Sequence, residues 1–195
     1  VMGTVHLLEA VRHRPGVRAV LIVTSDKCYD NQEWVWGYRE NEPLGGRDPY
    51  SSSKGCAELV TAAYRDAFFN AADYARYQVA IASARAGNVI GGGDWAEDRP
   101  VLDPVAGFPP LPGRLWAGAS PCGGAWSCGP ADDDAQPVHR LIEHLRTAWR
   151  QGGGTPPPWH FDRQTQPHEA HYLKLDCAKA RSRLGWQPRW PLSEA

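Results

Sequence analysis

Residues 17–27 read V-R-A-V-L-I-V-T-S-D-K, and this stretch decides the fold. Val17 to Val23 is an almost continuously apolar, β-branched run of strand length, which predicts a buried strand of a parallel sheet. The residues from Thr24 to Asp30 then lie at or beyond the carboxyl end of that strand. Open α/β sheets bind ligands at this edge, so we expect an α/β fold with a candidate site directly after the strand.

Two helices and a second strand are predicted around this run. Residues 3–13 have apolar side chains at three- and four-residue spacing, which predicts an amphipathic helix, and residues 50–69 predict a longer one. A second apolar run at 79–84 predicts another buried strand, and a glycine-rich loop follows it at 87–95. This strand–helix–strand order indicates a right-handed parallel unit.

Composition and charge exclude several classes of protein. The 195 residues are 42% hydrophobic and 22% charged, with a formal net charge of -1, which is typical of a folded domain and gives no basic field for nucleic acid or anionic membrane. We therefore expect no nucleic-acid partner and no membrane association. The five cysteines are odd in number and lack C-x-x-C spacing, which favours the reducing cytoplasm over a disulfide framework or a zinc site.

The chemistry-bearing residues form two groups. Tyr50 and Lys54 are four apart on the predicted helix, so they share one face, where a neighbouring ammonium favours the phenolate form of tyrosine. Such a pair also occurs on ordinary solvated helix faces. The other group, residues 24–27, places a hydroxyl, a carboxylate and an amine at a strand end. Burying such polar groups costs free energy, which favours a role in binding or catalysis. The alternative is that they form only a capping turn with no functional role.

Six segments together resemble the CDP-glucose 4,6-dehydratases of the extended short-chain dehydrogenase/reductase family. The similarity covers nearly the whole chain outside residues 100–130, and Lys27 after Asp26 is discriminating because the dTDP-glucose relatives have glutamate at that position. The segments are 23–29, 34–40, 48–54, 85–95, 167–171 and 184–188.

The resemblance implies a fold and a division into three parts. Residues 1–99 are expected to be the C-terminal part of a doubly wound parallel-sheet (Rossmann-type) domain that binds the dinucleotide and carries the catalytic residues. Residues 100–135, crowded with proline and glycine, are expected to be irregular and damaged. Residues 136–195, with a predicted helix at 137–150, are expected to be the remnant of a small nucleotide-sugar-binding domain.

It also implies a reaction on CDP-glucose with bound NAD. Tyr50 takes the proton of the 4-hydroxyl, assisted by Lys54, and Ser25 binds the 4-oxygen. Water is then lost across C5 and C6, with Asp26 as the acid and Lys27 at the position of the C5 base, before hydride returns to C6. The implied cofactor-binding residues are Thr24, Tyr50, Lys54, Ala86 and Asn88, and the implied substrate-binding residues are Ser25, Asn88, Gly91, Asp94, His168 and Glu169.

Other implications concern partners and metals. The resemblance implies a homodimer that acts in the cytoplasm in deoxysugar and O-antigen biosynthesis. His168 and His171 have H-x-x-H spacing, but no third ligand accompanies them, so we expect no metal site.

The sequence also departs from the family. A glycine-rich dinucleotide fingerprint is not found among these residues, which predicts a chain truncated at its N-terminus, and residues 99–101 are expected to mark an internal deletion. On this basis the 195 residues alone are expected to bind NAD too weakly to measure. The alternatives are another extended short-chain nucleotide-sugar dehydratase or epimerase, or a non-catalytic remnant that associates with an intact homologue.

Overall fold

The computed structural model describes residues 1–87, 110–117, 122–134, 136–160 and 170–188. Its centre is a three-stranded parallel sheet in the order β1-β2-β3, formed by Ala19–Val23, Ala80–Ala86 and Gly124–Cys128. The two strands predicted from residues 17–23 and 79–84 are confirmed as β1 and β2, in the expected parallel pairing. The predicted α/β fold is therefore correct.

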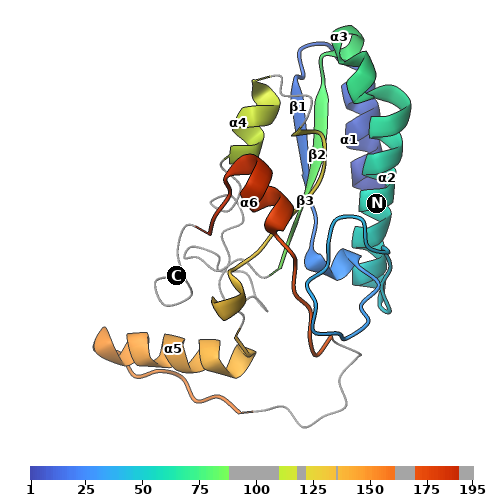
Figure 1. Cartoon of the computed structure of the whole chain (residues 1–195). Helices are drawn as coiled ribbons and strands as arrows, with labels where there is room; N and C mark the ends of the chain where they lie inside the picture. The colour runs from blue at the N-terminus through green and yellow to red at the C-terminus, as the bar shows by residue number, and fades with distance from the viewer. Residues whose placement is uncertain (88–109, 118–121, 135, 161–169, 189–195) are drawn as a thin grey trace.

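Helices cover both faces of the sheet (Figure 1). On one face lie α1 (Met2–His13) and α2 (Pro49–Phe68), which confirm the two long helices expected from sequence. The short helices α4 (Pro110–Trp116) and α6 (Ala178–Leu184) lie on the other face. Two further helices, α3 (Tyr74–Tyr77) and α5 (Val138–Gln151), complete the described helices, and α5 extends away from the sheet.

Each face of the sheet has its own apolar core. Leu8 and Val11 of α1 pack with Ile22 and Ile81 of the strands on the α1–α2 side. On the opposite side a larger cluster centres on Trp126, which is 1% exposed. β2 is buried along its whole length on both faces, which explains why its pattern does not alternate between apolar and polar residues.

The expectation of irregular structure through residues 100–135 is wrong for two described segments. Residues 110–116 form α4 although Pro110 and Pro112 are in it, because the first-turn amides of a helix have no intrahelical acceptor and a proline there breaks no hydrogen bond. Leu111 and Leu115 of this helix are each 1% exposed. Residues 124–128 form β3, which extends the sheet beside β2.

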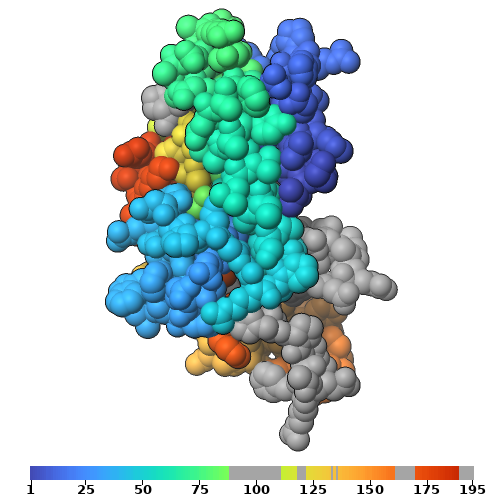
Figure 2. Space-filling view, turned by 90° about the vertical axis from the view of Figure 1, so that its right-hand side faces the viewer, coloured from blue at the N-terminus to red at the C-terminus, as the bar shows by residue number. Residues whose placement is uncertain are grey.

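The polar segment between β1 and α2 folds over the carboxyl end of the sheet. A short 3-10 turn, η1 (Asp26–Cys28), follows β1, and the loop after it is tied down by isolated bridges of Tyr29 with Leu44 and of Tyr38 with Leu175. Figure 2 shows this loop, in lighter blue, against the N-terminal end of α2. No helix among the described residues has the length and apolarity to cross a bilayer.

Candidate active site

The η1 turn is held by its own side chains. Ser25 Oγ donates to Asp26 Oδ1 at 2.9 Å, and the backbone amide of Lys27 donates to Ser25 Oγ at 3.1 Å and to Asp26 Oδ1 at 2.8 Å. The amide of Thr24 still pairs with the carbonyl of Ala84 at 2.8 Å, so the turn begins directly at the end of the sheet. A hydroxyl and a carboxyl are therefore fixed at the ligand-binding edge that the sequence predicted.

Burial changes the acidity of Asp26. Desolvation raises the pKa of its carboxyl, and this effect outweighs the hydrogen bonds from Ser25 and Lys27, which lower it. A methyl group at Gly87, after β2, would lie 3.1 Å from Asp26 Oδ2, so the carboxyl reaches across to the end of the neighbouring strand. A carboxyl with a raised pKa is suited to donate a proton.

The start of α2 fixes Tyr50 and Lys54. Asp48 is its N-cap, accepting from the amide of Ser51 at 2.9 Å, and Pro49 occupies the first turn. Ser51 donates to Asp48 from its hydroxyl as well as from its amide, and these two hydrogen bonds lower the pKa of the Asp48 carboxyl. Tyr50 is 56% exposed, and Lys54 Nζ lies 5.4 Å from the centre of its ring. The predicted pairing of these two side chains on one helix face is therefore observed.

Glycines allow α2 to approach the turn closely. A Cβ at Gly55 would lie 3.3 Å from the carbonyl oxygen of Cys28, and a Cβ at Gly46 would lie 2.4 Å from Cβ of Ser51. Helix α2 packs directly on η1. The structure thus places the two sequence-predicted groups, residues 25–27 and Tyr50 with Lys54, on adjacent packed elements.

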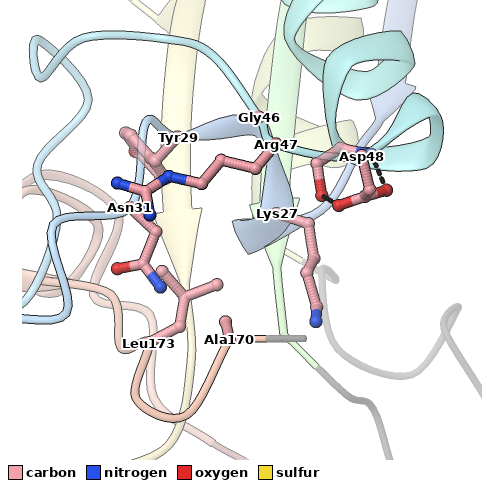
Figure 3. A pocket seen from close by; sticks show the side chains of 9 residues that line it. Lys27, Tyr29, Asn31, Gly46, Arg47, Asp48, Ala170 and Leu173 are labelled. Carbon is pink, nitrogen blue, oxygen red and sulfur yellow. Dashed lines mark hydrogen bonds between the residues drawn. The ribbon is translucent and has the colours of Figure 1, made fainter. Parts of the chain in front are cut away.

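A pocket opens beside the turn (Figure 3). Lys27 and Arg47 bring positive charge to its wall, and the charge of Lys27 contributes to lowering the pKa of Asp48. Arg47 was not predicted as a site residue. The one feature of the sequence that could have suggested it is its position three residues before Tyr50. The remaining wall is formed by Tyr29, Asn31, Gly46, Asp48, Ser51, Ala170 and Leu173.

Below the turn lies a buried polar network that the sequence analysis missed. Glu58 of α2 accepts hydrogen bonds from Thr24, Ser83 and Arg85, all buried. The hydroxyl of Thr24, predicted to bind the cofactor, is thus bonded inside the protein. Two features of the sequence could have indicated this network. Arg85 is a charged residue in a strand of mostly small, apolar residues, and Glu58 follows Lys54 by four residues, on the same face of the helix.

The remaining predicted residues are placed as follows. Ala86 is the last residue of β2 and is buried, paired with Cys128 of β3. Exposed His171 donates its amide to Glu33 at 3.1 Å. Five predicted residues lie outside the described ranges: Asn88, Gly91, Asp94, His168 and Glu169.

The fold is that of the nucleotide-sugar dehydratases and epimerases. The structure resembles dTDP-glucose 4,6-dehydratase from Bacillus anthracis in complex with NAD, with a TM-score of 0.62 at 20% identity, covering 100% of this chain and 65% of that one. It also resembles UDP-glucuronic acid 4-epimerase from Bacillus cereus, with a TM-score of 0.65 at 16% identity, covering 100% of this chain and 63% of that one.

Sequence comparison is more specific. The chain is 49% identical to CDP-glucose 4,6-dehydratase from Salmonella typhimurium over an alignment of 221 residues that includes all of this chain and 60% of the relative. By ancestry it is therefore a relative of that dehydratase, as the sequence resemblance predicted. Residues 1–77 also match the family model of GDP-mannose 4,6 dehydratase. Because the alignment is longer than the chain, part of the relative inside the matched region has no counterpart here.

Proposed function

We propose that this chain carries the catalytic residues of an NAD-dependent dehydratase that converts CDP-glucose to its 4-keto-6-deoxy derivative. The observation that carries the proposal is the packing of η1, with Ser25 as its N-cap and a half-buried Asp26, against the helix start that pairs Tyr50 with Lys54. The sequence identity with the Salmonella enzyme supports the substrate.

The residues present fit a nicotinamide cofactor. Tyr50 is exposed at the carboxyl edge of the sheet with the ammonium of Lys54 beside its ring, which leaves the phenol open to a ligand. We expect Lys54 and Tyr50 to hold the nicotinamide ribose. The chemistry that the bound cofactor would supply there is the removal of hydride from C4 of the sugar and its return to C6.

The chain's own groups move the protons. Tyr50 takes the proton of the 4-hydroxyl, and Ser25 donates a hydrogen bond to the 4-oxygen as it becomes a ketone. The ketone acidifies the hydrogen at C5, and Lys27 is the group that takes that proton. A double bond forms between C5 and C6, the bond from C6 to oxygen breaks, and Asp26 supplies the proton with which water leaves. When hydride is returned to C6, the proton that Lys27 took is returned to C5.

The half-buried acid favours a dehydratase over an epimerase. An epimerase needs C4 oxidation and reduction but has no leaving group to protonate. Asp26, with its raised pKa, is the group suited to that second task. In a non-catalytic chain the Asp26 carboxyl would serve only to hold the turn, through its bonds from Ser25 and the amide of Lys27.

The test uses a joined protein, in which the part of the Salmonella relative that lies outside the matched region is added to this chain. We expect it to convert CDP-glucose with NAD to a product lighter by one water, detected by mass spectrometry, and to convert UDP-, GDP- and dTDP-sugars more slowly. In Asp26→Asn, C4 oxidation without elimination should leave reduced cofactor on the protein. A folded joined protein that changes no nucleotide sugar would refute the proposal.

A further inference from the structure

Glu58 is the centre of a buried polar cluster that the proposed reaction does not use. Its side chain is 2% exposed and accepts three hydrogen bonds, from Thr24 Oγ1 at 2.5 Å, Ser83 Oγ at 2.7 Å and Arg85 NH2 at 2.8 Å. These donors come from the end of β1 and from β2, whereas Glu58 belongs to α2. One carboxylate therefore ties the helix to two neighbouring strands.

The position of Glu58 on α2 connects its carboxylate to the candidate active site. Glu58 lies four residues after Lys54 and eight after Tyr50, so all three side chains leave the same side of α2. Its partner Thr24 directly precedes Ser25. The bond from Thr24 to Glu58 thus links the strand end that bears one reactive group to the helix that bears the other.

Arg85 extends the link to the third strand. Its NH1 donates to Tyr29 Oη at 2.8 Å and to the carbonyl of Glu40 at 3.0 Å, and Tyr29 Oη lies 3.1 Å from Ser127 Oγ of β3. Its Nε has no acceptor among the described residues. The ion pair with Glu58 is almost fully buried, with side-chain exposures of 4% and 2%.

Stability alone is a weak reason for such a pair. Removing two charges from water costs much of what their attraction returns, and apolar side chains of similar volume often stabilise a core at least as well. What an apolar pair cannot supply is a directional acceptor for the Thr24 hydroxyl. We propose that Glu58 is a positioning residue, held in place by Arg85, whose bond to Thr24 fixes the Ser25–Lys27 turn relative to Tyr50 and Lys54; this role rests on the proposed function of those residues.

The test measures the turn directly in the 195-residue chain, without cofactor or substrate, by residue-resolved amide hydrogen exchange. Thr24→Val removes the hydroxyl that Glu58 accepts, and Thr24→Ser retains it. Thr61→Val is the matched control: Thr61 is also a buried threonine, on α2, but its hydroxyl donates at 2.7 Å only within the helix, to the carbonyl of Ala57.

In Thr24→Val we expect about tenfold faster exchange of the amides of residues 27–29, which close the turn, with the amides of β2 unchanged. Thr24→Ser should restore the wild-type rates, and Thr61→Val should leave residues 27–29 unaffected. Equal acceleration in Thr24→Val and Thr61→Val, acceleration throughout the sheet, or no change in residues 27–29 would each overturn the positioning role. Because no turnover is measured, these outcomes are independent of whether the proposed reaction occurs.

Discussion

Replacing Glu58 by glutamine tests how strongly the buried network holds the sheet to α2. The change preserves the shape of the side chain but removes its charge, so the guanidinium of Arg85 stays buried without its counterion. The glutamine amide keeps one acceptor oxygen, so the donors that faced the other oxygen meet an NH2 group, which is itself a donor. Breaking one partner of a buried pair costs about 3–5 kcal/mol.

That loss is large against the ~5–15 kcal/mol by which domains are usually stable. Urea unfolding followed by tryptophan fluorescence measures it, and with a slope of about 2 kcal/mol per molar the midpoint should fall by roughly 1.5–2.5 M. Arg39→Gln is the control, because its pair with Asp176 has an Arg39 side chain that is 68% exposed and should contribute under about 1 kcal/mol. Equal losses in the two variants would show that burial gives the Glu58–Arg85 pair no greater effect on stability than the exposed pair has.

Three further predictions follow from single residues. Cys56 is the exposed cysteine among five, so thiol labelling of the native chain should modify one cysteine quickly and the other four only on unfolding. Burial raises the pKa of Asp26 above its usual 3.8. The stability that this shift contributes is therefore complete below pH 3.8 and is lost as the pH rises through the pKa of the folded state. Asp26→Asn should raise the unfolding temperature near pH 7 but not below about pH 4. Gly46→Ala should lower the unfolding temperature, since its methyl group meets Ser51 at 2.4 Å, whereas Gly3→Ala, with nothing within 4 Å, should not lower it; equal effects of the two would contradict the close approach at α2.

Sequence reasoning predicted the elements whose periodicity is strong. The apolar runs in β1 and β2 and the helical spacing of α1, α2 and α5 follow from burial, which a pattern of side chains records directly. The pairing of Tyr50 with Lys54 followed from helix geometry.

Other features depend on contacts that no local pattern records. β3 reads G-A-W-S-C, which has no β-branched residue, and it is a strand because it pairs with β2 and buries Trp126. The prolines of α4 suggested a broken helix, yet their place in its first turn makes them compatible with it. In the sequence Glu58 is an ordinary polar residue of a helix. Only the folded structure shows that Arg85, which is distant in sequence, donates a hydrogen bond to it.

Tyr50 is proposed as the base of a dehydratase site, and the turnover of Tyr50→Phe in the joined protein measures that role. The variant lacks only the phenol oxygen, and Tyr172→Phe, which changes a tyrosine that is 42% exposed, is the matched control. We predict that Tyr50→Phe lowers the rate of water loss from CDP-glucose by at least about a hundredfold with NAD affinity nearly unchanged, while Tyr172→Phe keeps the wild-type rate. Wild-type turnover in Tyr50→Phe would show that Tyr50 is not the base.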